Sequence, residues 1–164
     1  MNILRSLCLV FAVAATTAAS AAGGEPGPPR LESLDGRPVH IGGTRGGTIL
    51  AFWRADCAPC LLELRAARSY AAAARPARFL FVGLQDGPTL ASAARKAGAP
   101  VEMLVRGVGS ASAILTAYGG APPRLPLAIA LTPSGSLCGR HGGLLGTDQV
   151  RAWARDCGAM HAGR

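Results

Sequence analysis

The stretch from Thr48 to Cys60 constrains the fold of this chain more than any other part of it. Thr48 to Trp53 is an apolar run without a breaker, which is typical of a buried strand. A short polar turn follows, and we expect a helix from Ala58 to about Ala73. Pro59 then falls in the first turn of that helix, where a missing backbone N–H leaves no hydrogen bond unmade. The stretch therefore predicts a strand, a turn and a helix in direct succession.

Two cysteines stand at the start of the expected helix, in the order Cys57-Ala58-Pro59-Cys60. The free N–H groups and the positive end of the helix dipole favour the thiolate of Cys57. Cys60 lies one turn further in, more enclosed and close enough to form a disulfide with Cys57. This placement predicts a redox-active pair, since it exposes and activates the first sulfur.

These residues carry a family resemblance. Phe52-Trp53 before the pair, the pair itself, and Glu63 three residues after it resemble the thioredoxin-like thiol–disulfide oxidoreductases. Within them, the chain is similar to the exported branch of TlpA, ResA and the cytochrome-c-maturation thioredoxins. The resemblance implies an α/β fold, with a central mixed sheet flanked by helices and an N-terminal β-hairpin, over residues 31–157. It also implies protein thiol or disulfide substrates, a membrane electron donor, and no organic cofactor.

The rest of the chain agrees with such an order of elements. Asp35-Gly36 is a turn signal between two short β-like pieces, where the family has a hairpin. Strands alternating with helices further on indicate at least one parallel crossover. The expected elements are a strand at 79–84, a helix at 89–97 ended by Gly98, a short strand at 101–105, a helix at 110–118, strands after Pro126 and at 137–141, and a helix from 147 to about 157 with Thr147 as N-cap.

Pro126 is the family's cis proline by this resemblance, because a strand and then a glycine turn follow it at the family spacing. The match implies that Pro126 packs against the disulfide and leaves the backbone of Leu125 free to pair with a substrate peptide. An ordinary trans proline at a strand start is the alternative. Pro122 and Pro123 fit less well, since no strand follows them directly.

Several acidic positions depart from the thioredoxin pattern. Ala51 stands where thioredoxins carry a buried aspartate that handles protons, and the resemblance to the TlpA/ResA branch passes that role to Glu63. Glu63 could equally be a first-turn acid that only complements the helix dipole. Asp56 replaces the usual aromatic before the first cysteine and should raise the pKa of the Cys57 thiol. Arg54 could offset this effect.

Metal binding is a minority interpretation of the cysteines. A structural zinc site usually needs four ligands from two close pairs, and this chain has one pair. Cu(I) binding by Cys57 and Cys60, with His141 as a further candidate ligand, is the rival function. His40, His141 and His161 each stand alone, so we predict no metal site. Cys138 and Cys157 could form a structural disulfide or remain two separately buried thiols.

The N-terminal segment of the chain indicates export to the periplasm. Residues 1–21 combine a basic start, a short apolar core and the small residues Ala19-Ser20-Ala21, which is typical of a cleaved signal peptide. An uncleaved membrane anchor is the alternative. A linker is expected at 22–30 and a tail at 158–164.

The formal net charge of +8 is spread along the chain without a basic run, so we expect no nucleic-acid partner. We expect a monomer.

Overall fold

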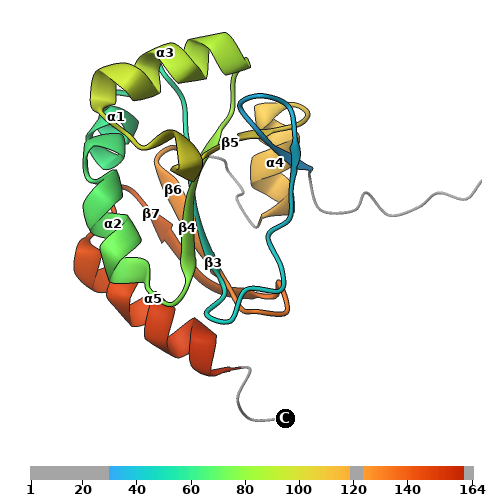
Figure 1. Ribbon diagram of the computed structural model, residues 1–164, viewed down its shortest axis with the longest axis vertical. Coiled ribbons are helices and arrows are strands. Elements are labelled where there is room, and N and C mark those ends of the chain that lie inside the picture. Colours follow the sequence, from blue (N-terminus) through green and yellow to red (C-terminus); the bar gives the residue numbers. More distant parts are fainter. Residues whose placement is uncertain (1–29, 119–123, 161–164) are drawn as a thin grey trace, which may run out of the picture.

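The computed structural model describes residues 30–118 and 124–160 of the chain. The expected signal segment, Pro122 and Pro123, and His161 lie outside these described residues. A seven-stranded mixed sheet in the order β2-β1-β5-β4-β3-β6-β7 forms the middle layer, with helices on both faces (Figure 1). The strands are β1 (Leu31–Ser33), β2 (Pro38–Val39), β3 (Thr48–Trp53), β4 (Arg78–Gly83), β5 (Leu104–Gly107), β6 (Leu127–Leu131) and β7 (Leu137–Gly142).

The strand that leads to the cysteines, β3, lies inside the sheet. It runs parallel to β4 and antiparallel to β6, and all six of its residues are buried. Gly47, directly before β3, has φ of 81° and lies against the backbone carbonyl of Leu131, where a Cβ atom would not fit. The predicted N-terminal hairpin is confirmed: β1 pairs antiparallel with β2 around Gly36, and β1 also pairs with β5.

The helices divide between the two faces of the sheet. They are α1 (Ala58–Arg65), α2 (Ala67–Ala74), α3 (Gly87–Ala97), α4 (Ala111–Ala117) and α5 (Thr147–Ala159), with a short 3-10 helix, η1 (Val101–Met103). In Figure 1, α4 lies on one face of the sheet and the other four α-helices lie on the opposite one. Alternate residues of β3 serve the two cores, since successive side chains of a strand point to opposite faces. Ile49, Ala51 and Trp53 join the core under α1, α2 and α5, and Leu50 and Phe52 join the core under α4.

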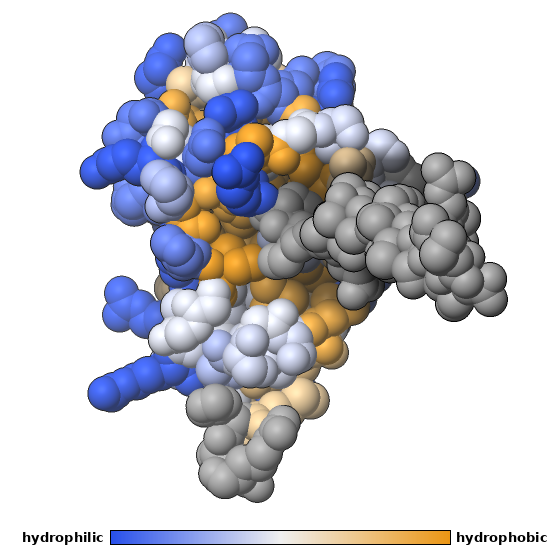
Figure 2. Space-filling model, turned by 90° about the vertical axis from the view of Figure 1, so that its right-hand side faces the viewer, coloured by the Kyte–Doolittle hydropathy of each residue, from blue (hydrophilic) through white to orange (hydrophobic). Residues whose placement is uncertain are grey.

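The α4 side of the molecule is apolar over part of its surface. Figure 2 shows hydrophilic side chains over the upper end of this face and an apolar area below them. The core beneath this side contains Ile114, Leu115 and Tyr118 of the α4 region, packed on Leu80 and Val82 of β4. No helix within residues 30–118 or 124–160 is long and apolar enough to cross a membrane.

Several predicted element boundaries are wrong. The single helix expected from Ala58 to about Ala73 is two helices, divided at Ala66, whose N–H donates to the Glu63 carbonyl at 3.0 Å. The division lets α1 pack against α3 while α2 packs against α5. The N-cap of α5 is Gly146 rather than Thr147, and no side chain caps this end.

Two further boundaries shift by a few residues. The helix expected at 89–97 starts two residues earlier, at Gly87, because the Asp86 carboxylate caps it by accepting from the Thr89 N–H at 2.9 Å. Gly98 ends this helix with φ of 73°, as predicted. The strand expected at 101–105 begins only at Leu104, after η1.

A disulfide joins the last strand to the last helix. The Cα atoms of Cys138 in β7 and Cys157 in α5 are 5.8 Å apart, and the sulfurs are bonded. Of the two states that the sequence left open for these cysteines, the structure has the bridge. The bridge joins α5 to β7, which is the edge strand of the sheet and lies next to β6.

Candidate active site

The turn after β3 places Cys57 at the mouth of α1. Cys57 is the N-cap residue of the helix, and its sulfur accepts a hydrogen bond from the backbone N–H of Cys60 at 3.3 Å. Pro59 lies in the first turn, as predicted. The side chain of Gln85, after β4, holds the turn by accepting from the Ala55 N–H at 2.6 Å. An N–H group of the first helical turn thus faces the first sulfur, which is the arrangement that favours a thiolate.

The two cysteines of the pair differ in access to solvent. They form a disulfide with a Cα–Cα distance of 5.2 Å. Cys57 is half-buried, whereas Cys60 is completely buried. A two-step thiol exchange requires one sulfur that a protein partner can approach and a second, enclosed sulfur that reacts with the first.

Pro126 lies beside the buried sulfur. The Leu125–Pro126 peptide bond is cis, as the resemblance implied, and Pro126 lines the same small cavity as Cys60. The carbonyl of Pro126 accepts from the N–H of Gly143, which follows β7. The segment before β6 and the segment after β7 therefore meet next to the redox pair.

Glu63 is buried beneath the pair, with an exposed fraction of 4 %. Its Oε1 atom accepts from the backbone N–H of Leu145, and the carbonyl of Leu145 accepts from the Tyr70 hydroxyl. Burial raises the pKa of Glu63, while the Leu145 N–H, the nearby Tyr70 hydroxyl and the charge of His141 lower it to a smaller extent. Burial and the neighbouring Glu63 raise the pKa of Tyr70.

This environment excludes one of the two expectations for Glu63. The first turn of α1 contains no acidic residue, and a carboxylate enclosed in the core is not a solvent-exposed partner of the helix dipole. Glu63 is instead a buried acid, and burial increases its affinity for a proton.

A cavity of about 10 Å³ connects Glu63 with Cys60. Trp53 and Pro126 also line it. Within the described residues, two buried polar atoms have no hydrogen-bond partner, Trp53 Nε1 and Glu63 Oε2, and both belong to residues of this wall. A volume of this size corresponds to about one water molecule, and a buried water typically binds polar groups of this kind.

The carboxylate next to the first cysteine is neutralised locally. Arg54 donates to both oxygens of Asp56, from Nε and Nη2, at 2.9 Å each. The hydrogen bond from Arg54 holds the pKa of Asp56 below its ordinary value, and Asp56 in turn raises the pKa of Arg54. The sequence suggested that Arg54 could offset the effect of Asp56 on the Cys57 thiol. The structure contains this pairing, as an ion pair of two hydrogen bonds on the surface.

The remaining candidates do not come together. Across residues 30–118 and 124–160, no group of three or more His, Cys, Asp or Glu side chains is placed to hold a metal ion. His141, on β7, has its Nε2 atom 3.0 Å from the carbonyl of Leu144. Sequence reasoning missed Leu145, Tyr70 and Gln85. Leu145 acts through its backbone, so no side-chain pattern could have indicated it.

Comparisons with known proteins identify the fold. A thioredoxin-related protein from Neisseria meningitidis serogroup B superposes with a TM-score of 0.64 at 17% identity, over 77% of this chain and 97% of that one. StoA from Bacillus subtilis gives 0.59 at 19% identity, over 76% and 93%. A secreted disulfide oxidoreductase of Mycobacterium tuberculosis, homologous to E. coli DsbE, gives 0.59 at 17% identity, over 77% and 93%.

The fold is thioredoxin-like. No family model matches the sequence, and no curated protein matches it either. The thioredoxin-like arrangement confirms the fold class expected from the resemblance, a mixed sheet with helices on both faces and an N-terminal hairpin.

Proposed function

We propose that this chain is an exported thiol–disulfide oxidoreductase that exchanges disulfides with protein substrates, acting as a reductant. The observation that carries the proposal is the disulfide between a half-buried N-cap cysteine and a buried one on a thioredoxin-like fold. Solved structures with this fold include proteins described as a disulfide oxidoreductase and a thiol:disulfide interchange protein. No organic cofactor or metal is needed for the exchange.

In this mechanism Cys57 is the nucleophile and Cys60 the resolving thiol. The Cys57 thiolate attacks one sulfur of a substrate disulfide, forming a mixed disulfide and releasing the other sulfur as a thiolate. Cys60 then attacks the Cys57 sulfur, so the substrate leaves as a dithiol and the pair is oxidised. The substrate gains the two electrons that the pair loses. A membrane electron donor would restore the reduced pair in the periplasm.

Glu63 is the proposed acceptor of the Cys60 proton. Both residues line one small cavity, and the raised pKa of the carboxyl keeps its proton affinity closer to that of a thiol. A single water in that cavity would bind Glu63 Oε2 and the Trp53 N–H and offer a path to the buried sulfur. Pro126 packs beside the pair, and the backbone of Leu125 is proposed to align a substrate strand.

Export is proposed from residues 1–21, with a mature N-terminus at Ala22. Proteins of this fold include one described as secreted and one described as an exposed lipoprotein, which supports an extracytoplasmic site of action. Intact-mass measurement of the protein from the cell envelope tests the cleavage. A mass that retains residues 1–21 would favour a membrane anchor instead.

A trapping experiment tests the function. Cys60→Ser removes the resolving thiol, so the variant expressed in its native compartment should carry covalently bound proteins that reductant releases. Cys57→Ser is the matched control and should trap none. If the control traps partners and Cys60→Ser does not, the two roles are reversed. If neither traps anything and both keep wild-type activity, the oxidoreductase proposal fails. The reduction potential of the pair then decides between reductant and oxidant.

A further inference from the structure

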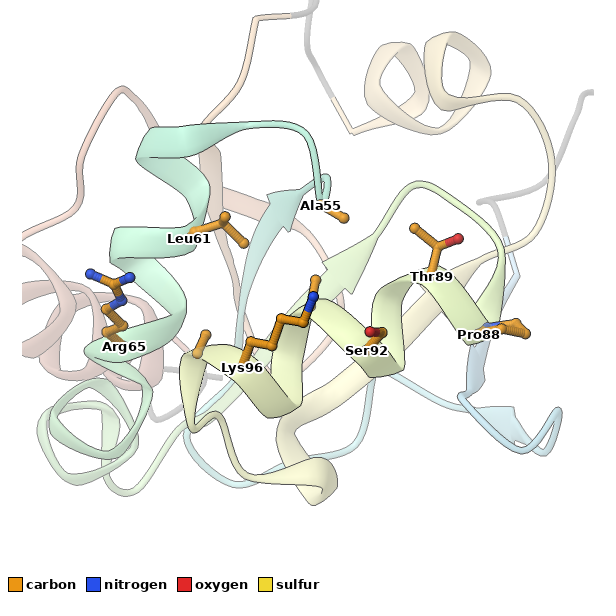
Figure 3. A pocket seen from close by; sticks show the side chains of 9 residues that line it. Ala55, Leu61, Arg65, Pro88, Thr89, Ser92 and Lys96 are labelled. Atoms are coloured by element: carbon orange, nitrogen blue, oxygen red, sulfur yellow. The ribbon is translucent and has the colours of Figure 1, made fainter.

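A groove lies between α1 and α3, beside the turn that carries the redox pair. Its volume is about 650 Å³, and its lining includes Ala55, Leu61, Arg65, Thr89, Ala93 and Lys96. In Figure 3, Leu61 points from α1 toward α3, Lys96 extends along α3, and Ala55 lies at the end next to the redox turn. The proposed function uses none of these side chains.

The groove continues the face of α1 on which the reactive sulfur lies. Cys57, Leu61 and Arg65 are spaced four residues apart, and residues at this spacing share one face of a helix. The N–H of Leu61 donates to the carbonyl of Cys57 at 3.2 Å, so Leu61 lies one turn below the sulfur. On α3, Thr89, Ala93 and Lys96 repeat the pattern at intervals of four and three. A chain bound to Cys57 can therefore extend along both helices.

The charge of the groove is positive. Arg65 and Lys96 are exposed, and neither forms an ion pair within the part of the chain that the structure describes. The carboxylates near the groove are already engaged, because Asp56 binds Arg54 and Asp86 caps α3. Two cations beside an apolar strip are complementary to a segment that carries carboxylates and aliphatic side chains.

We propose that this groove binds an acidic, extended segment of the protein substrate that is disulfide-linked to Cys57. The proposal rests on the proposed function and names its substrate class. Arg65 lies eight positions after Cys57, which is a distance of about 12 Å along the helix at ~1.5 Å per residue. An extended chain covers that distance in about four residues. The acidic residues of the substrate should therefore lie about three to five residues from its reactive cysteine.

Synthetic peptides that carry one cysteine as a mixed disulfide with thionitrobenzoate test this. The Cys57 thiolate of the reduced protein attacks the peptide sulfur, the old disulfide breaks, and the coloured thionitrobenzoate anion leaves. Cys60 then attacks the Cys57 sulfur, which releases the peptide thiolate and leaves the pair oxidised. The peptides carry two glutamates four and five residues from the cysteine, two glutamines there, or two glutamates directly beside it.

Arg65→Glu/Lys96→Glu is the test variant, and Arg68→Glu/Arg95→Glu is its control. Arg68 and Arg95 are also exposed but do not line the groove, and the net charge changes equally. The wild type should release thionitrobenzoate from the distant-glutamate peptide with a larger second-order rate constant than from the glutamine peptide at low salt. The test variant should lower the ratio of these two rate constants about tenfold, as for the loss of two exposed ion pairs, and the control should keep it.

Three other results overturn the proposal, and they can be told apart. A wild type without preference shows that the groove does not select acidic segments, while the proposed function stands. An equal loss of preference in both double variants assigns it to net charge rather than to the groove. A wild type that releases thionitrobenzoate from no peptide faster than Cys57→Ser removes the proposed function together with this inference.

Discussion

Replacement of both cysteines of the Cys138–Cys157 disulfide by alanine should lower the free energy of unfolding by about 4 kcal/mol, of which about 3 kcal/mol comes from the lost cross-link. The two residues are separated by 19 positions in the sequence. Cross-linking a loop of that size removes about 11 cal/mol/K of entropy from the unfolded chain in the loop-closure model, which is about 3 kcal/mol at 25 °C. Cys157 is also 2 % exposed, so Cys138→Ala/Cys157→Ala loses packing worth about 1 kcal/mol in addition.

Urea unfolding of the wild type and of Cys138→Ala/Cys157→Ala, both with the Cys57–Cys60 disulfide intact, measures this difference. The extrapolated free energies should be compared rather than the midpoints, since a cross-link changes the compactness of the unfolded chain. Cys57→Ala/Cys60→Ala is the control. Its closed loop spans a separation of only three, so its entropic loss should be smaller by about 1.5 kcal/mol. A loss below about 1 kcal/mol in Cys138→Ala/Cys157→Ala, or free thiols at both positions in the oxidised wild type, would refute the reasoning.

Three further predictions concern the site and the strand that leads to it. Arg54→Gln frees the charge of Asp56 and should raise the pKa of the Cys57 thiol, whereas Asp56→Asn should lower it; thiolate absorbance against pH measures both, and no change in either would mean that solvent screens the pair. Burial raises the pKa of Glu63 above its ordinary value of 4.5, so the folded state holds this proton more tightly than the unfolded state. Relative to Glu63→Gln, the wild type should therefore be most stable below about pH 4.5 and lose stability as pH rises through the raised pKa, and parallel pH profiles of the unfolding free energy would contradict this. Gly47→Ala should cost more than about 2 kcal/mol, because a Cβ meets the Leu131 carbonyl at positive φ, while Gly43→Ala, at the same φ of 81° in open space, should cost about 1 kcal/mol in the same thermal unfolding assay.

The parts of the fold that could be predicted from the sequence are those with local causes. The buried run before Cys57, Pro59 in the first turn and Gly98 at a helix end each determine the conformation within a few residues of themselves. The division of the helix at Ala66 could not be predicted, since Arg65, Ala66 and Ala67 all suit a helix interior. It follows from packing, with α1 against α3 and α2 against α5.

The candidate site could be predicted only in part for a similar reason. Cys57 and Cys60 can be identified from their spacing, and Pro126 from its distance to the following strand and turn. The environment of Glu63 depends on the backbone N–H of Leu145, which is 82 positions away in the sequence. A backbone group at that separation has no side-chain signature, so sequence alone left two interpretations of Glu63 open.

Each of the two tryptophans of the chain lies beside one of the two disulfides found in residues 30–118 and 124–160. Trp53 shares a cavity wall with Cys60, and Trp153 lies against Gly139, the residue after Cys138, one helical turn before Cys157. A disulfide close to an excited indole accepts an electron from it and quenches its emission. The intensity of the intrinsic tryptophan fluorescence should therefore depend on whether each of these cysteine pairs is oxidised or reduced. With either tryptophan replaced by phenylalanine, the other would report the state of its own pair, without an added dye.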